Sequence, residues 1–210
     1  MTENKNFQDF ETVEAESSRV NLIRVERMYE SLRYNDYSAQ NGLGEIVDNS
    51  VEAQASEIHI ITSSDKVRKA NKKREIDTIT EICVVDNGCG MDKETLHKCL
   101  ALGESIRSNY AGKRGIGRFG VGMTLGSISL ARRIEVFSRT HLLENFFYTY
   151  IDLDEIQNGN LTAIPKPVCQ DPPEKYKRFI ENSSGTIVIL KKCDRVEGET
   201  DNFGNYLGRT

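Results

Sequence analysis

The chain has little of what marks several common kinds of functional site. Its 210 residues include three scattered histidines and five cysteines, and no two cysteines form a C-x-x-C pair. This pattern argues against a zinc site, and it predicts cysteines that pack as small hydrophobic side chains in a reducing compartment. No apolar run approaches the length of a membrane span, and the polar, acidic N-terminus does not resemble a signal peptide. These absences predict a cytoplasmic protein with no membrane contact.

An excess of one charge is also missing. The 28 Lys and Arg residues against 32 Asp and Glu leave a formal net charge of −4, so the overall charge indicates neither nucleic acid nor membrane as a partner. The local exception is 66–74, where six of nine residues are basic. A nucleic-acid arm and a solvated hairpin loop both fit this segment. The loop is favoured, because no aromatic residues interleave and the segment lies between two predicted strands.

The length allows one sizeable domain with its own core. We expect a flexible N-terminal arm over 1–18, a folded domain over 19–193, and a polar tail or linker start over 194–210 without a core-forming pattern. Hydrophobic periodicity and capping residues predict helices at 19–34, 42–55, 93–102, 123–131 and 173–180. Composition and alternation predict strands at 57–62, 78–85, 133–139, 145–153 and 185–190.

The helix predicted over 42–55 has two unlike faces, because successive residues turn by about 100°. The apolar face carries Leu43, Ile46, Val47 and Val51. The opposite face carries Glu45, Asp48, Asn49 and Glu52. A solvated face usually mixes charges of both signs, whereas this one has three acids, an amide and no cation. A bound metal ion, or a water molecule that needs a base, would explain the pattern; a plain solvent-facing side is the alternative.

The strand predicted over 78–85 leads directly into Asp86-Asn87-Gly88-Cys89-Gly90-Met91. An Asp-Asn-Gly sequence is by itself an ordinary turn. Two nearby glycines also let the backbone approach a flat ligand without interference from a Cβ atom. An aspartate at the end of a buried strand can accept a hydrogen bond from the exocyclic amine of adenine, where guanine carries a carbonyl.

Four glycines occur within 115–122, and a helix-like stretch follows at once. A glycine-rich loop that leads into a helix N-terminus offers free N–H groups and a positive dipole end to phosphate. A flexible linker is the alternative. The segment matches neither a Walker A loop nor a Rossmann fingerprint. The preceding stretch, 104–113, has no hydrophobic period and is predicted to be mobile.

Four motifs occur in order: E-x-x-x-N at 45–49, D-x-G-x-G at 86–90, G-x-x-G-x-G at 117–122 and G-T at 185–186. Asn49 and Asp86 are 37 positions apart, and Gly90 and Gly117 are 27 apart. This order and spacing resemble the GHKL ATPases, which unite gyrase, the ninety-kilodalton heat-shock chaperone, sensor histidine kinases and the mismatch-repair ATPase. The stretch G-R-F-G-V-G-M is most similar to the chaperone and microrchidia-like branches.

The resemblance, which covers 21–191, implies an α/β two-layer sandwich of the Bergerat type. Its sheet would be mixed and mostly antiparallel, with helices on one face and with ATP and Mg²⁺ as cofactors. Glu45 would activate water as a general base, Asn49 would hold Mg²⁺ through its amide oxygen, and Asp86 would accept from the adenine amine. The other residues implied to contact the nucleotide are Gly88, Gly90, Met91, Gly117, Gly120, Val121, Gly122 and Thr186.

The resemblance implies Mg-dependent binding and slow hydrolysis of ATP, with a lid over 103–122 whose closure drives conformational change or dimerisation. A second function remains open, that of an ATP-binding switch with little intrinsic hydrolysis. Relatives often receive a Lys or Arg for the γ-phosphate from a transducer domain, which this chain is too short to hold. Such a domain, or a protein partner, is therefore expected outside it. Nucleic-acid binding through 66–74 is a third possibility.

Overall fold

A computed structural model describes residues 23–34, 38–67, 76–103, 121–141, 144–181 and 183–196. The strands are β1 (Ile58–Val67), β2 (Ile76–Asp86), β3 (Ala131–Arg139), β4 (Phe147–Asp152), β5 (Val168–Cys169) and β6 (Gly185–Cys193). The helices are α2 (Val25–Arg33), α3 (Ala39–Glu52), α4 (Lys93–Lys98), α5 (Gly122–Leu130), α6 (Leu153–Gln157) and α7 (Glu174–Lys177). Each of the five strands predicted from the sequence is present, and β5 was not predicted.

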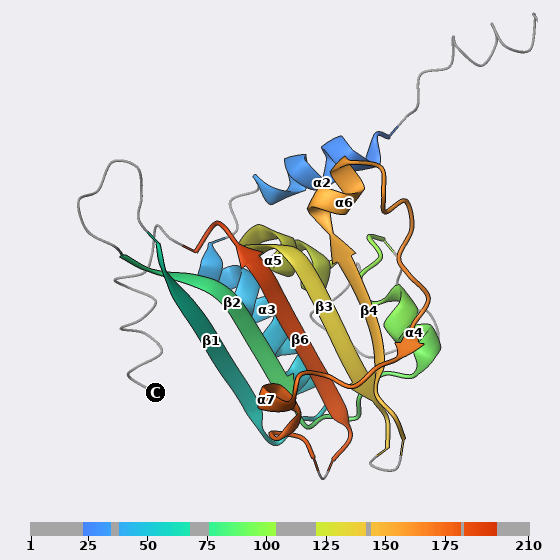
Figure 1. The fold of residues 1–210 in the computed structure, drawn as a ribbon. Helices are drawn as coiled ribbons and strands as arrows, with labels where there is room; N and C mark the ends of the chain where they lie inside the picture. The colour runs from blue at the N-terminus through green and yellow to red at the C-terminus, as the bar shows by residue number, and fades with distance from the viewer. Residues whose placement is uncertain are drawn as a thin grey trace, which may run out of the picture.

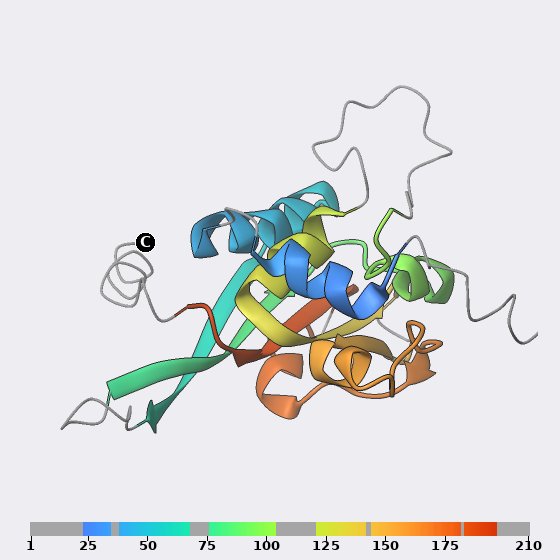
Figure 2. The ribbon, with the colours of Figure 1, turned by 90° about the horizontal axis from the view of Figure 1, so that it is seen from above.

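The strands form one six-stranded sheet in the order β1-β2-β6-β3-β4-β5, and each neighbouring pair is antiparallel. In Figure 1, α3 and α5 lie behind this sheet and the short α7 lies in front of it. The view from above in Figure 2 agrees with this arrangement of layers. The predicted α/β sandwich is therefore confirmed, with its main helices on one face. The sheet was predicted to be mixed, but among the described strands it is antiparallel throughout. The strand predicted over 78–85 lies inside the sheet, as its apolar end indicated.

Two apolar cores result from the alternation of side chains along the inner strands. Ile82 and Val84 of β2 point toward the main helices, where they join Ile46 of α3 in the larger core. Cys83 and Val85 point the other way, into a smaller core. The side chains that cover this second core from the α7 segment are Tyr176 and Ile180. Neither has more than 2% of its surface exposed, so both sheet faces are covered here.

Helices α3 and α5 touch through their backbones. A Cβ atom on Gly126 would lie 2.6 Å from the carbonyl oxygen of Gly42, and one on Gly42 would lie 2.8 Å from the carbonyl oxygen of Gly126. Any larger residue at either position would push the helices apart, since real Cβ contacts are almost never this short. This crossing brings the first turn of α5 beside the middle of α3.

Helices α2 and α3 differ from the predictions both in their bounds and in the residues that they bury. Among the described residues the first helix starts at Val25 rather than at the predicted residue 19, and Ile23 is 61% exposed. The buried residues of this helix, α2, are Tyr29 and Arg33. Helix α3 begins three residues before the predicted start, because Ser38 caps it by accepting a hydrogen bond from the Asn41 N–H at 3.1 Å. Val51, assigned to the apolar face, is 60% exposed, because that end of α3 projects beyond the core.

The tail prediction was wrong for the residues just after β6. Val196 is 1% exposed and belongs to the larger core. Asp194 forms an ion pair with the buried Arg33 of α2, and the Nε of Arg33 also donates to the carbonyl oxygen of Ile128, in the last turn of α5, at 2.8 Å. A cation at a helix C-terminus opposes the helix dipole favourably. The residues after β6 are thus part of the packed domain.

The cysteines divide between core and surface. Cys83, Cys99 and Cys193 are buried, as the sequence predicted for all five. Burial raises the pKa of these thiols to about 12 for Cys99 and Cys193, so they stay protonated and behave as small apolar groups. Cys89 and Cys169 are exposed, contrary to that prediction, because Cys89 lies in the loop after β2 and Cys169 lies in the edge strand β5.

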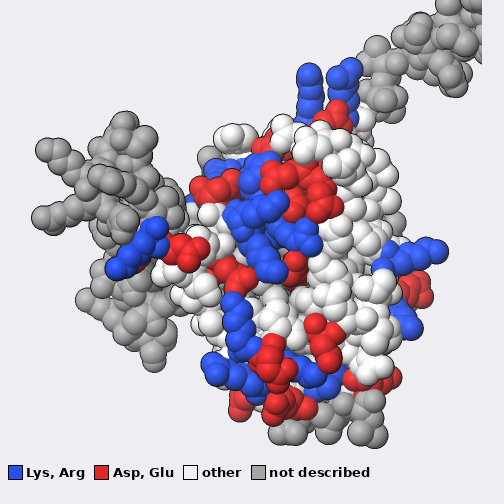
Figure 3. Space-filling model, in the orientation of Figure 1, with Lys and Arg blue, Asp and Glu red and all other residues white. Residues whose placement is uncertain are grey.

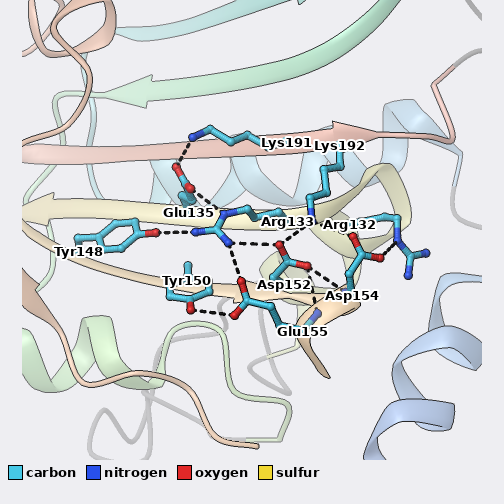
Figure 4. A network of polar contacts seen from close by, with 10 residues as sticks. All are labelled: Arg132, Arg133, Glu135, Tyr148, Tyr150, Asp152, Asp154, Glu155, Lys191 and Lys192. Atoms are coloured by element: carbon cyan, nitrogen blue, oxygen red, sulfur yellow. Dashed lines mark hydrogen bonds and ion pairs between the residues drawn. The ribbon is translucent and has the colours of Figure 1, made fainter. Parts of the chain in front are cut away.

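A network of ion pairs covers the part of the second sheet face that α7 leaves open (Figure 4). Arg133 donates to Glu135 at 2.8 Å and to Asp152 at 3.2 Å, and Lys192 also donates to Asp152 at 2.8 Å. Burial alone would raise the pKa of Asp152, but the bonds from Lys192 and Arg133 lower it. Positive and negative side chains accordingly alternate on the face seen in Figure 3.

The basic segment 66–74 lies mostly outside the described residues, which include only its first two positions, Lys66 and Val67.

Candidate functional site

Three polar side chains form a row across the ends of three neighbouring strands. Asp86 at the end of β2 pairs in register with Thr186 near the start of β6, which pairs in turn with Ser138 near the end of β3. All three are on the helix-covered face, since their neighbours two positions away, such as Val84 and Val136, belong to the larger core. They are 5%, 7% and 0% exposed, respectively. Polar side chains that are buried in this way need hydrogen-bond partners, either from the protein or from a ligand.

Asp86 is held by donors on each of its carboxylate oxygens. The Gly88 N–H donates to Oδ1 at 2.9 Å, and the Ser50 hydroxyl of α3 donates to Oδ2 at 3.0 Å. Burial raises the pKa of Asp86, and the bonds from Gly88, Ser50 and the Thr186 backbone N–H oppose that shift. The result is an oriented hydrogen-bond acceptor between α3 and the sheet.

The loop after Asp86 is shaped by contacts with the protein itself. The side-chain oxygen of Asn87 accepts from the N–H groups of Ser56 and Glu57, both at 2.9 Å. A Cβ atom on Gly88 would lie 2.7 Å from the Cβ of Ala53. Gly90 has φ of +68°, and a Cβ atom there would lie 2.0 Å from the carbonyl oxygen of Arg139. Tight packing within the protein therefore requires glycine at both positions. The sequence analysis had instead explained these two glycines by close approach of the backbone to a ligand.

Glu45 and Asn49 are one turn apart on α3, and the Glu45 side chain faces α5. The amide nitrogen of Asn49 donates to the carbonyl oxygen of Glu45 at 2.7 Å, so the amide oxygen is the atom that Asn49 can offer to a ligand. A Cβ atom on Gly122, the first residue of α5, would lie 2.2 Å from Oε2 of Glu45. The Glu45 carboxylate thus lies directly against the N-terminus of α5.

The N-terminus of α5 suits an anion. Its N-cap residue is Val121, which has no side chain that could cap the first N–H groups. The backbone N–H groups and the positive dipole end of a helix N-terminus together favour phosphate. The Glu45 carboxylate beside this end is an unfavourable neighbour for an anion unless a cation or a water molecule lies between the two.

The described residues contain no cluster of three or more His, Cys, Asp or Glu side chains that could hold a metal ion. Mg²⁺ does not require one, because it commonly takes one or two protein oxygens and completes its shell with water and phosphate oxygens. The amide oxygen of Asn49 fits this limited role. The same residues include no helix that is long and apolar enough to cross a bilayer.

The structure groups the predicted site residues into two adjoining sets. Glu45, Asn49, Val121 and Gly122 lie where α3 meets α5, and Asp86, Gly88, Gly90, Met91 and Thr186 lie at the strand ends. Ser50, which follows Asn49 in α3 and binds Asp86, joins the sets. Gly117 and Gly120, with the rest of the predicted lid from 104 to 120, fall outside the described residues.

Two polar residues of the site were missed from the sequence, Ser50 and Ser138. Ser138 accepts from the Met91 N–H at 2.8 Å and contacts the Thr186 hydroxyl at 2.9 Å. A signal was present, because Ser138 continues the inward-facing positions of Ile134 and Val136. A small hydroxyl at the end of such a row indicates a buried polar contact.

Residues 37–186, most of the chain, match a family model described as histidine kinase-, DNA gyrase B-, and HSP90-like ATPase. The chain is 30% identical to Protein MICRORCHIDIA 5 of Arabidopsis thaliana over 102 residues, 49% of this chain and 13% of that protein. It is 26% identical to ATPase MORC2B of Mus musculus over 200 residues, 78% of this chain and 18% of that protein. It is 22% identical to ATPase morc-1 of Caenorhabditis elegans over 218 aligned positions, which cover 95% of this chain and 23% of that protein. The chain spans less than a quarter of each relative.

Proposed function

The chain belongs to the family of histidine kinase-, DNA gyrase B- and HSP90-like ATPases, and on this premise we propose that it binds Mg-ATP between α3, α5 and the strand ends, and hydrolyses it slowly. The observation that carries the proposal is the contact of Gly122 with Glu45. This contact supports the proposal because the N-terminus of α5, the end of a helix that favours phosphate, lies directly beside a carboxylate. Asp86, which Ser50 joins to the same helix, supplies the second half of a nucleotide site.

The base would bind at Asp86. Both oxygens of this side chain already accept bonds from the protein, and a carboxylate oxygen has a further lone pair for an exocyclic amine. Adenine offers such an amine at purine position 6, where guanine has a carbonyl that a carboxylate repels. The buried position excludes competing water, which strengthens this preference for adenine.

The phosphates would bind at the N-terminus of α5, where backbone N–H groups act as donors. Mg²⁺, when bound, would neutralise phosphate charge, and Asn49 would hold it through the amide oxygen. Glu45 would accept a proton from water that attacks the terminal phosphate, since its carboxylate is already directed at that helix end. In this arrangement Asn49 acts in binding and in turnover, and Glu45 acts in turnover alone.

Mutation of the two α3 residues tests this division. Glu45→Ala is expected to bind Mg-ATP at least as tightly as the wild type while phosphate release falls by ~10²–10⁴. Asn49→Ala is expected to lose Mg-dependent binding and turnover together. Isothermal titration and single-turnover phosphate release on both variants separate these outcomes. If the wild type binds ATP but releases no phosphate, the chain is an ATP-binding switch that needs a cation from a further domain or a partner.

Residues 103–122 would act as a lid that closes on the bound nucleotide and promotes dimerisation. The support is their place in the chain, since they end at the first turn of α5, where the phosphates would bind. Hydrogen exchange with and without Mg-ATP tests closure, and equal protection across 104–118 in both states argues against it. Light scattering with a non-hydrolysable analogue tests dimerisation, and a monomer with filled sites contradicts it.

A further inference from the structure

Ser138 lies fully buried at the end of β3 with three polar atoms around one hydroxyl. The Met91 backbone nitrogen is 2.8 Å from its oxygen, the Gly185 carbonyl oxygen is 3.0 Å away, and the Thr186 hydroxyl oxygen is 2.9 Å away. Each is within ordinary hydrogen-bond distance. Ser138 therefore connects the residue predicted to wall the base, Met91, with the residue that pairs with Asp86, Thr186.

The donor and acceptor roles in this group follow from the number of protons. A serine hydroxyl has one proton and two lone pairs. The Met91 N–H can only donate and the Gly185 carbonyl can only accept. Ser138 therefore satisfies all its partners when it donates to Gly185 and accepts from both Met91 and the Thr186 hydroxyl. If Ser138 donated to Thr186 instead, the Gly185 carbonyl would lose this donor, and no new bond among these four groups would replace it.

In the satisfied arrangement the single hydroxyl proton of Thr186 points at Ser138. Thr186 can then show only lone pairs to the base pocket. Its in-register neighbour, the carboxylate of Asp86, is also an acceptor. The two side chains together form a row of acceptors with no donor.

We infer that Ser138 is a specificity-determining residue: by holding the Thr186 hydroxyl as an acceptor, it makes the pocket select a 6-aminopurine over a 6-oxopurine. This inference rests on the proposed binding of ATP. An amino group at position 6 donates to such a row, either directly or through water. A carbonyl there meets acceptors alone, and a buried acceptor left without a donor is disfavoured. Ser138 reaches the ligand through Thr186 and so acts as a positioning residue.

Removal of the Ser138 hydroxyl frees the proton of Thr186. In Ser138→Ala, Thr186 can rotate and donate to a carbonyl at position 6. Inosine triphosphate is the appropriate probe, because it differs from ATP in the purine 6-position and the accompanying N1 proton. One gained neutral hydrogen bond predicts that the ratio of the Kd for ITP to the Kd for ATP falls about two- to tenfold.

The experiment measures Mg-ATP and Mg-ITP binding by calorimetry in the wild type, Ser138→Ala, Thr186→Val and the double variant. The ratio is expected to fall in Ser138→Ala and to stay unchanged when the same substitution is made in Thr186→Val, which has no hydroxyl to rotate. Ser138→Thr, which keeps the hydroxyl, is expected to retain the wild-type ratio. If Ser138→Ala does not fold, Ser138→Cys keeps the shape with a much weaker donor and acceptor, and the same fall is expected.

Equal weakening of ATP and ITP in Ser138→Ala would show that Ser138 only supports the structure and would overturn the inference. A fall of the ratio that persists in the Thr186→Val background would overturn it as well. If the wild type binds Mg-ATP and the ratio of the Kd for ITP to the Kd for ATP is the same in Ser138→Ala, the inference is refuted and the proposed function still stands. A wild type that binds no Mg-ATP refutes the proposed function, and the inference with it.

Discussion

Gly122→Ala should impair turnover by displacing Glu45 without harming the fold. The added Cβ atom would lie 2.2 Å from Oε2 of Glu45, whereas ordinary contacts begin at 3.4 Å. The carboxylate must therefore move by about 1.2 Å, the difference between these distances. Displacement of a catalytic group by about 1 Å can reduce the rate roughly 10²-fold. The contacted atom is the end of a flexible side chain, so the free energy of unfolding should change little.

The assay is phosphate release under single-turnover conditions, together with Mg-ATP binding and urea unfolding. Gly44→Ala is the matched control, because it makes the same chemical change next to Glu45. No described atom lies within 4 Å of the Cβ position at Gly44. Its turnover should equal that of the wild type, and alanine in a helix interior should raise the free energy of unfolding by about 0.5–1 kcal/mol.

Wild-type turnover in Gly122→Ala would refute the assignment of Glu45 as the base, because the carboxylate cannot keep its position beside a new methyl group. A similar loss in both variants would also refute it, since any added methyl group on this part of the molecule would then have the same effect. Loss of turnover together with unfolding of Gly122→Ala would show that the Glu45 side chain is held more rigidly than proposed.

Three further predictions concern Asp86 and the end of the domain. Asp86→Asn should weaken Mg-ATP binding roughly 10- to 150-fold in calorimetry, because a charge-assisted hydrogen bond is worth about 1.5–3 kcal/mol; wild-type affinity would place the adenine elsewhere. Because burial raises the pKa of Asp86, the native state binds this proton more tightly than the unfolded state. Stability should therefore fall as the pH rises from the ordinary Asp pKa through the raised one, and ATP affinity should fall as the pH drops through the raised pKa. A pH series of urea unfolding and ATP titrations should show both trends in the wild type, and stability trends identical in Asp86→Asn would contradict the assignment. Val196→Ala, at a site 1% exposed, should lower the free energy of unfolding by about 1–3 kcal/mol, against about 0.5 kcal/mol or less for Val51→Ala at 60% exposure; equal effects would refute the packing of Val196.

Local patterns were sufficient to predict much of the fold. The alternating segment around Val136 and the apolar segment around Val188 predicted strands, and both form inner strands of the sheet. A helix was predicted to begin at residue 93, and the Asp92 carboxylate caps that helix by accepting from the Thr95 N–H at 2.7 Å. These features succeed because they depend on residues a few positions apart, whose geometry the helix or strand period determines.

Boundaries and exposed faces were less predictable. The helix after Asp92 ends at Lys98, several residues before the predicted end near Gly103. Val51 has the correct helical phase for the core, but α3 extends beyond the surface that could cover it. Periodicity specifies the direction of a side chain, and the neighbouring elements decide whether anything lies there.

In the candidate site, too, local sequence patterns predicted some features and the tertiary structure decided others. The motif residues Glu45, Asn49 and Asp86 were proposed as site residues from their chemistry and order along the chain, and the structure brings α3 and the end of β2 together through the bond from Ser50 to Asp86. The contact between Gly122 and Glu45 is visible only once α5 crosses α3, because the two residues belong to separate helices with a sheet hairpin and another helix between them in sequence.

The sequence by itself was sufficient to predict the main strands and helices, and to propose which residues serve as hydrogen-bond acceptor, general base and phosphate-binding glycines. Tertiary structure alone decided which polar groups are partners. Ser50 and Asp86 are 36 positions apart, Ser138 and Thr186 are 48 apart, and Arg33 and Asp194 are 161 apart. The reason is physical: a buried hydroxyl or guanidinium must find a partner wherever the packing of the elements provides one, and no local pattern in the chain records that distance.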